Sequence, residues 1–226
     1  MSTERKISAV IITFNEERNI GRCIDSLHEI ADEIVVVDSL SKDKTVAIAK
    51  EKGARVVDHA FEGYIEQKNY AITCAKYEYV LSLDADEALS KELTKSIIEV
   101  RKELKYSVYS FNRLTNYCGK WIKHCGWYPD VKVRLFDKKI GSWGGKNPHD
   151  TFIAKPGATS LHLAGDLLHY SFYTIEEHVK QIDHFSTIGA KAYYEKGKRS
   201  NVLKLVFSPA FIFVRNYIFK MGFLDG

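Results

Sequence analysis

The sequence predicts an α/β protein: a Rossmann-like, mostly parallel central sheet flanked by helices, with a C-terminal helical extension. Apolar segments of strand length alternate with helix-length segments over residues 7 to 87. The expected strands are too apolar for sheet edges, as in parallel sheets covered on both faces. Two of these strands end in carboxylates, and such sheets bind ligands at the carboxyl ends of their strands.

The elements follow one another with short connections. A helix cap at Ser41 or Asp43 and a stop at Gly53 bound one of the helices. Residues 106–170 are richer in Tyr, Trp, Gly and Asn and lack helical periodicity, so we expect mixed strands and loops there. The expected elements are strand 7–14, helix 20–30, strand 34–38, a helix ending at Gly53, strand 54–57, helix 65–75, strand 79–84 and helix 174–196.

The length and composition indicate one enzyme-sized unit. With 226 residues, of which 45% are hydrophobic and 27% charged, the chain can bury a substantial core. We expect a catalytic domain over residues 1–170, made of halves 1–105 and 106–170, and an extension over 171–226. The four cysteines lack the spacing of a zinc site. The chain enters its first strand at Ile7 without a signal peptide, so we expect reduced thiols in the cytoplasm.

The most informative segment is Asp84-Ala85-Asp86, which follows the buried strand 79–84. Two carboxylates in this pattern suit Mg²⁺ or Mn²⁺, which take oxygen ligands from proteins and complete their shell with phosphates and water. An acidic turn before the next helix, with Ser90 as its N-cap, is the alternative.

Several motifs together resemble one family. Val-Ile-Ile-Thr-Phe-Asn-Glu-Glu at 10–17, Val-Val-Val-Asp-Ser at 35–39, Gln-Lys-Asn at 67–69 and Asp-Ala-Asp-Glu at 84–87 occur in order. The chain resembles the family 2, GT-A type, glycosyltransferases over nearly its whole length. Later segments are similar to a bacterial subgroup that includes lipopolysaccharide core glucosyltransferases: Val-Arg-Leu-Phe at 133–136, Trp143, Pro-His-Asp at 148–150, Leu-Leu-His-Tyr-Ser at 167–171 and the terminal Gly-Phe-Leu-Asp-Gly.

The resemblance implies a site for the nucleotide of a UDP-sugar. Carboxylates and amides are suitable hydrogen-bond partners for a uracil edge and ribose hydroxyls. Turn or cap roles remain the alternatives for Asp38 and Asn15, and a solvated helix position is the alternative for Lys68, which would otherwise meet the diphosphate. The implied nucleotide-binding residues are Thr13, Phe14, Asn15, Glu17, Asp38, Lys68, Asp84 and Ala85.

The resemblance also implies a divalent cation. Asp86 would bind Mg²⁺ or Mn²⁺ directly, and Asp84 would meet the ribose or reach the metal through water. His169 matches the position of a C-terminal histidine that joins the same metal in this family; a core histidine is the alternative. The cation would stabilise the charge that grows on the departing nucleoside diphosphate.

Asp150 matches the family's catalytic base. A carboxylate there can take the proton of the acceptor hydroxyl as the new bond forms. The subgroup commonly has His-Glu where this chain has His149-Asp150, one methylene shorter, and a self-bonded loop aspartate is the alternative. Arg134, Trp143 and His149 are expected on the acceptor side. The tryptophans 121, 127 and 143 could stack on sugar faces, although aromatic residues often simply belong to the core.

We therefore expect an inverting enzyme that moves one sugar, glucose or a related hexose, to a hydroxyl of a cell-envelope glycan or glycolipid such as lipopolysaccharide core. A single base implies direct displacement, since no second carboxylate is identified as a nucleophile. The Gln-x-x-Arg-Trp signature of processive relatives is absent from the sequence, so one sugar is transferred per encounter. We expect no nucleic acid partner, and a homo-oligomer is left open.

The C-terminal segment is basic and aromatic. Residues 191–226 carry a net charge of +5, whereas the rest of the chain carries −1. The apolar run is interrupted by Arg215, and we expect it to be too short to span a bilayer. A segment of this kind fits the interface of an anionic membrane, here the cytoplasmic face of the bacterial inner membrane. Packing on the catalytic domain, or a dimer contact, is the alternative. The subgroup continues beyond Gly226, which leaves a shortened C-terminus open.

Two other classes of protein remain open. A nucleotidyltransferase shares the α/β layout but usually has a glycine-rich phosphate loop after its first strand, where this chain has Asn-Glu-Glu-Arg at 15–18. A non-catalytic membrane-docking protein would explain the basic tail but not the ordered polar strand ends.

Overall fold

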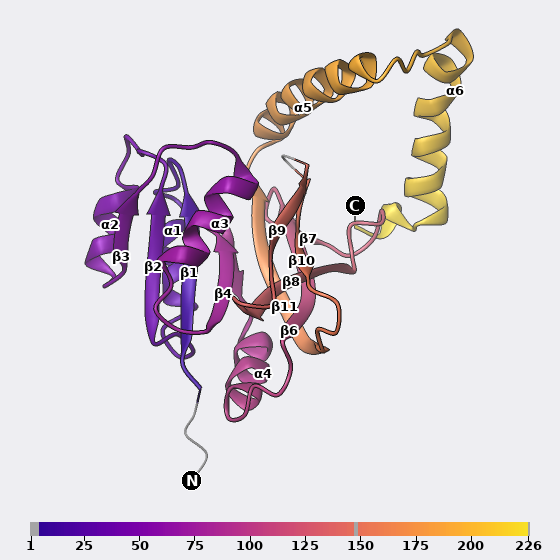
Figure 1. Cartoon of the computed structure of the whole chain (residues 1–226). Helices are drawn as coiled ribbons and strands as arrows, with labels where there is room; N and C mark the ends of the chain where they lie inside the picture. The colour runs from indigo at the N-terminus through magenta and orange to yellow at the C-terminus, as the bar shows by residue number, and fades with distance from the viewer. Residues whose placement is uncertain (1–4, 147–148, 226) are drawn as a thin grey trace. The chain divides into compact units, whose positions relative to one another are not determined.

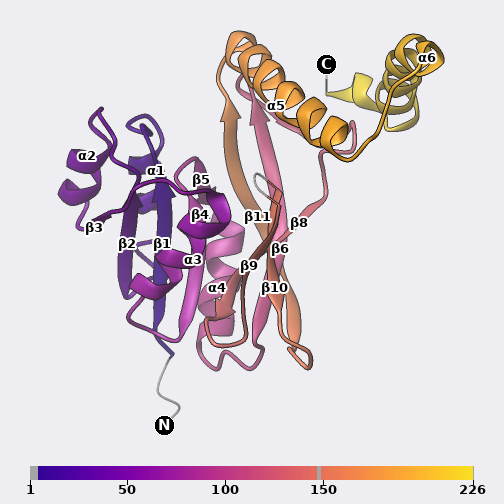
Figure 2. The same cartoon turned by 45° about the horizontal axis from the view of Figure 1, so that its top comes forward.

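The computed structural model describes residues 5–146 and 149–225. Within them, a nine-stranded sheet has the order β3-β2-β1-β4-β8-β6-β11-β5, with β7 added alongside β6. Strands β3, β2, β1 and β4 are parallel and stand side by side in Figures 1 and 2. The pairs β4–β8, β5–β11 and β6–β7 are antiparallel. The predicted α/β class is confirmed.

The parallel half holds the expected alternation of strands and helices. It consists of β1 (Ile7–Thr13), α1 (Ile20–Asp25), β2 (Glu33–Asp38), α2 (Thr45–Glu51), β3 (Arg55–Asp58), α3 (Tyr64–Cys74) and β4 (Tyr79–Asp84). Helix α1 ends at Asp25 and not at Ile30 as expected. The Ser26 hydroxyl donates to the Cys23 carbonyl (2.7 Å) and accepts from the Leu89 N–H (3.1 Å), and such side-chain bonds compete with helix propagation.

The remaining elements complete the large sheet and add a separate two-stranded sheet. They are β5 (Glu87–Leu89), α4 (Lys91–Arg101), β6 (Val108–Tyr117), β7 (Lys120–Ile122), β8 (Asp130–Asp137), β9 (Gly141–Lys146), β10 (His149–Ala154) and β11 (Ser160–Phe172). Strands β9 and β10 form a separate antiparallel pair. Ser90 caps α4 as expected, since its hydroxyl accepts from the Leu93 N–H.

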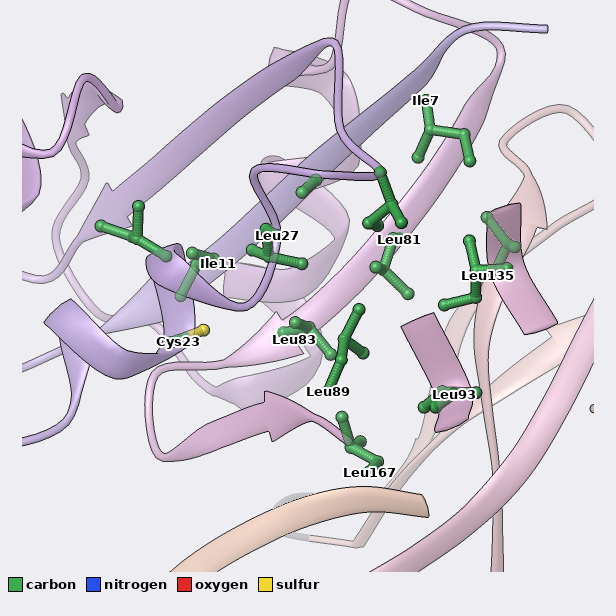
Figure 3. Close-up of a cluster of buried hydrophobic side chains, with 14 of the residues drawn as sticks. Ile7, Ile11, Cys23, Leu27, Leu81, Leu83, Leu89, Leu93, Leu135 and Leu167 are labelled. Atoms are coloured by element: carbon green, nitrogen blue, oxygen red, sulfur yellow. The ribbon is translucent and has the colours of Figure 1, made fainter. Parts of the chain in front are cut away.

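The core lies on both faces of the sheet because side chains alternate along each strand. On one face, Ile7 and Ile11 of β1 and Leu81 and Leu83 of β4 pack with α1 and α4 (Figure 3). On the other face, Val10, Ile12 and Val80 pack against α3 and the β9–β10 hairpin. Burial on both sides explains why these strands are nearly continuous in apolar residues.

Contacts divide the chain into two compact units: residues up to 113 with 131–169, and residues 114–130 with 170–226. Segment 114–130, which the sequence grouped with the acceptor half, belongs to the second unit. That unit contains α5 (Ile175–Glu195), α6 (Val202–Phe213), a π-helical segment η1 (Val214–Phe219) and a short 3-10 helix η2 (Gly222–Leu224). Its C-terminal Asp225 accepts from the backbone N–H groups of Lys123 (3.0 Å) and His124 (2.7 Å).

Helices α6 and η1 form one continuous helical segment, Val202–Phe219. Its mean hydropathy is 1.5 over 18 residues, and no part of it is buried. At about 1.5 Å per residue it extends close to the thickness of a bilayer core. By length and composition alone it could cross a membrane, which corrects the expectation that the run is too short. Arg215 interrupts the apolar run as expected, but it does not end the helix, which continues through it as η1.

Candidate active site

The carboxyl ends of three parallel strands meet at one edge of the sheet. Thr13 of β1 lies in register with Asp38 of β2, and the neighbouring Ile12 lies in register with Asp84 of β4. The Thr13 hydroxyl is buried and has no hydrogen-bond partner among the residues that the structure describes. Phe14 follows directly and is 54% exposed, so its ring is open to solvent at this edge.

The loop after β1 is joined to the loop after β2 by several hydrogen bonds. Asn15 adopts a left-handed conformation (φ 54°), which asparagine tolerates better than most residues. Its N–H donates to the Ser41 hydroxyl (2.8 Å), and Glu17 accepts from the Lys44 N–H (3.0 Å). Asp38 accepts from the Ser41 N–H (2.7 Å). These polar side chains therefore fix the shape of both loops, and the carboxylates retain further acceptor positions for a ligand.

A buried cluster of charges surrounds Asp84. Lys68 of α3 is 2% exposed, and its Nζ lies 3.0 Å from Asp84 Oδ1. Arg134 of β8 is 3% exposed and donates to Asp84 Oδ2 (2.9 Å) and Glu87 Oε1 (2.7 Å). Burial alone would raise the pKa of Asp84, but Lys68 and Arg134 outweigh it and hold that pKa well below its usual range. The Asp84 side chain is therefore ionised and carries a negative charge at neutral pH.

The same lysine reaches the predicted base. Lys68 Nζ donates to Asp150 Oδ2 on β10 at 2.8 Å. Asp150 is 82 positions away in sequence and arrives through the β9–β10 hairpin. The structure therefore brings Asp150 and Asp84 together around one ammonium group.

Asn69, which is not among the site residues expected from the sequence, holds that hairpin against α3. Its Nδ2 donates to the Trp143 carbonyl and its Oδ1 accepts from the Trp143 N–H, both at 2.9 Å. The side-chain amide therefore pairs with the outer edge of β9 much as another strand would. The only available signal was its place in the Gln-Lys-Asn motif.

Trp143 and Arg134, two of the residues expected on the acceptor side, are buried and do not face an open acceptor site. Trp143 is 5% exposed and packs on Phe136 and Phe152, so its ring is not open to a sugar. Arg134 lies beneath the site in ion pairs. The side chain of His149 lies outside the described part of the structure. In the second unit, Trp121 packs on Tyr170, and Trp127 packs on Tyr117 and His178.

The two predicted metal ligands lie next to each other. Asp86 Oδ2 and His169 Nε2 are 3.1 Å apart, and neither side chain is fully buried. Two ligands at right angles on a cation with bonds of about 2.1 Å are separated by about 3 Å, so this pair fits a divalent cation. Among the described residues, no group of three or more His, Cys, Asp or Glu side chains is arranged to hold a metal ion. Ala85 is buried, which leaves only its backbone at the turn.

The proton state of His169 depends on the same contact. Burial alone would lower the pKa of His169, but the Asp86 carboxylate raises it above the ordinary histidine value. A cation that binds both side chains must displace this proton, so its affinity should fall as the pH falls.

Glu16 also faces this acidic edge, although Glu17 is the residue expected from the sequence. Burial raises the pKa of Glu16 to about 7, and the negative charges of Asp86, Asp43 and Asp84 act in the same direction. Its carboxylate accepts from Asn19 Nδ2 (2.8 Å). The negative charges that act on Glu16 would favour a cation bound near it.

Two solved structures of other proteins have a similar fold. The mannosyltransferase PcManGT from Pyrobaculum calidifontis, in complex with GDP-Man and Mn²⁺, matches 75% of this chain and 58% of its own at a TM-score of 0.55 and 18% identity. Residues 1–349 of S. aureus TarS match 74% of this chain and 60% of their own at a TM-score of 0.50 and 18% identity. The chain therefore spans less than two thirds of each of these structures. The fold is the GT-A fold of glycosyltransferases.

Sequence comparison identifies the family. Residues 8–155 match the sequence profile of Glycosyl transferase family 2. The chain therefore belongs to this family. An uncharacterized glycosyltransferase of Rickettsia typhi is 33% identical over 98% of this chain and 82% of its own length. The lipopolysaccharide core biosynthesis glycosyltransferase LpsC of Rhizobium meliloti is 30% identical over 96% of this chain and 82% of its own length. The expected family membership is confirmed.

Proposed function

We propose that this glycosyltransferase moves one hexose, glucose or a relative, from a UDP-sugar to a hydroxyl of a cell-envelope glycan or glycolipid such as lipopolysaccharide core. The transfer is non-processive and inverts the anomeric centre. The observation that carries this proposal is the arrangement of Asp84, Lys68 and Asp150. One buried lysine joins the carboxylate that ends β4 to a carboxylate on the β9–β10 hairpin.

The nucleotide would occupy the edge formed by the ends of β1, β2 and β4. The buried Thr13 hydroxyl has no hydrogen-bond partner among the described residues, and Phe14 offers an exposed ring. Asp38 and Asp84 can accept hydrogen bonds from the base or ribose. Lys68 supplies a positive charge toward the diphosphate.

Asp86 and His169 would hold Mg²⁺ or Mn²⁺. When bound, the cation supplies positive charge against which the nucleoside diphosphate can leave. Asp86 brings an oxygen ligand suited to either cation, whereas the nitrogen ligand of His169 suits Mn²⁺ better than Mg²⁺, which prefers oxygen. Asp84, already committed to Lys68 and Arg134, remains beside the ribose.

Asp150 would act as the base. As the acceptor oxygen forms its bond to the anomeric carbon, the hydroxyl proton passes to Asp150, and the bond to the diphosphate oxygen breaks with its electron pair. One base and no assigned carboxylate nucleophile correspond to a single displacement, which inverts the configuration. The similarity to LpsC over 96% of the chain supports lipopolysaccharide core as the acceptor class.

Nucleotide selectivity tests this function. UDP with Mn²⁺ should raise the thermal unfolding temperature of the protein by several degrees, because ligand binding stabilises the folded state. CTP and GTP should have little effect, and GDP serves as the control for a guanosine-based donor. Protection by CTP or GTP but not by UDP would instead indicate a nucleotidyltransferase.

We assign residues 1–170 to catalysis and residues 171–226 to attachment at an anionic membrane surface on the cytoplasmic side. In α6 and η1, side chains such as Leu205, Phe211 and Phe219 are more than half exposed. The apolar residues of α5, Ile175, Val179 and Ile182, are also exposed. Such surfaces beside Lys204, Arg215 and Lys220 fit a lipid interface with anionic headgroups.

Reversing the charge of Lys204, Arg215 and Lys220 together should reduce sedimentation of the protein with anionic liposomes. Each basic residue near such a surface contributes about 1 kcal/mol, so the combined loss should exceed tenfold in apparent affinity. Reversal of Lys50, Lys95 and Lys102 in the first unit is the matched control. Unchanged sedimentation, or equal loss in the control, would favour a packing or dimer role for the tail.

A further inference from the structure

Two consecutive residues of α3 hold the hairpin that carries Asp150. Asn69 pairs with the Trp143 backbone in both directions, and Lys68 Nζ lies 4.7 Å from the centre of the Trp143 ring. The Asn69 contact is uncharged, whereas Lys68 carries the charge that reaches Asp150. The hairpin therefore has two attachments of different chemistry, and an added anion would disturb only the charged one.

The ion pair occupies one of the two carboxylate oxygens that could take the proton. Asp150 Oδ2 accepts from Lys68 at 2.8 Å, and its side chain is 13% exposed. A general base must come within hydrogen-bond distance of the hydroxyl whose proton it takes. With Lys68 in this position, an acceptor hydroxyl has to share the little remaining access to the carboxylate.

Lys68 is also the cation through which an arriving diphosphate can act on Asp150. Arg134 is committed to Asp84 and Glu87, so it cannot leave without exposing a buried charge. Lys68 has a flexible stem and a compact charge, and it faces two carboxylates. A diphosphate at this edge would compete with Asp150 for the same ammonium group.

We propose that Lys68 is a donor-sensitive latch on the catalytic base. The Lys68–Asp150 ion pair restrains Asp150 while the donor is absent, and the diphosphate draws Lys68 away and frees the carboxylate. Asn69 is a positioning residue that keeps the hairpin on α3 while the ion pair opens. The donor therefore binds before the acceptor hydroxyl can react. This inference rests on the proposed function, namely a diphosphate-linked donor and Asp150 as the base.

Affinity for UDP in the presence of Mn²⁺, measured by calorimetry, tests the latch without any turnover. Asp150→Asn removes the competing charge, so UDP should bind about tenfold more tightly, the scale of one charged hydrogen bond. Lys68→Met should weaken UDP binding about tenfold or more. In the double variant the gain from Asp150→Asn should disappear, because the two residues act through one contact.

The matched control is Glu99→Gln, which removes one negative charge from an exposed position on α4, on the opposite face of the sheet. It should leave UDP affinity within about twofold, as expected for a screened surface charge. If Lys68→Met fails to fold, Asp150→Asn and Asp150→Ala in the otherwise unchanged chain still decide the sign of the effect.

Unchanged or weaker UDP binding in Asp150→Asn would overturn the latch, as would an equal gain in the Lys68→Met background. Tighter UDP binding with turnover retained would show that UDP competes with Asp150 for Lys68, but it would overturn the latch, because Asp150 would then not be the base. The same cycle is run with GDP if GDP is the nucleotide that binds. Absence of binding by both nucleotides would overturn the latch together with the proposed donor.

Discussion

Replacing Asp86 with alanine should abolish sugar transfer and weaken UDP binding in the presence of Mn²⁺. Asp86 and His169 form the pair of side chains whose spacing fits a divalent cation. Loss of one ligand leaves the histidine alone to hold the cation, and without the cation the negative charge on the departing diphosphate is met by Lys68 only. Removing stabilisation of this kind costs about 100-fold to 1000-fold in rate.

The metal dependence of the effect separates this explanation from simple damage to the fold. UDP affinity measured without divalent cations should be nearly the same in Asp86→Ala and parent protein. His169→Ala should reproduce the metal-dependent part of the loss, whereas Glu99→Gln should not. An Asp86→Ala protein that binds UDP and turns over like the parent would show that the metal assignment is wrong.

Asp150→Asn should lower turnover by about 100-fold or more while UDP binding does not weaken. Asparagine keeps the shape of the side chain but cannot take a proton, and general base catalysis contributes on this scale.

Asp150→Glu provides the matched comparison. Glutamate restores a carboxylate and the residue that the resembling subgroup commonly has, at the cost of one added methylene. A displacement of about 1 Å can cost about 100-fold, so the parent rate need not be reached. Glutamate should nevertheless retain far more activity than asparagine. Equal rates for asparagine, glutamate and parent would require another carboxylate as the base.

The parallel half of the fold was predictable because its information is local. The length and apolar composition of β1, β2 and β4 predict these strands directly. Their parallel arrangement then places Thr13, Asp38 and Asp84 at one edge of the sheet. The cap at Ser90 is equally local. In contrast, the short α1 depends on a contact of Ser26 with Leu89, which no pattern around residue 26 contains.

The centre of the site depends on contacts between distant residues. Lys68 meets Asp150 across 82 positions, and Asp86 meets His169 across 83. The roles of Asp86, Asp150 and His169 came from the resemblance to a family, not from spacing. Trp143 shows the limit of residue type as a guide, since a tryptophan beside an acceptor loop serves the core equally well.

The C-terminal segment could not be resolved from composition because the same residues suit several surroundings. Leu205 and Phe211 are apolar enough for a core, a dimer contact or a lipid interface, and only their exposure in the structure separates the first from the others. Arg215 interrupts the apolar run as expected, but it does not end the helix, because arginine is a good helix former.

An assay that follows the labelled sugar of a UDP-hexose tests the proposed glycosyl transfer most directly. Purified protein with Mn²⁺, UDP-glucose labelled in the sugar and a lipopolysaccharide core acceptor lacking its terminal hexose should release UDP and move label into the acceptor in equal amounts. Asp150→Asn should abolish both products. Formation of pyrophosphate from a sugar phosphate and UTP, with no transfer of label from any UDP-hexose to the acceptor, would contradict the proposal.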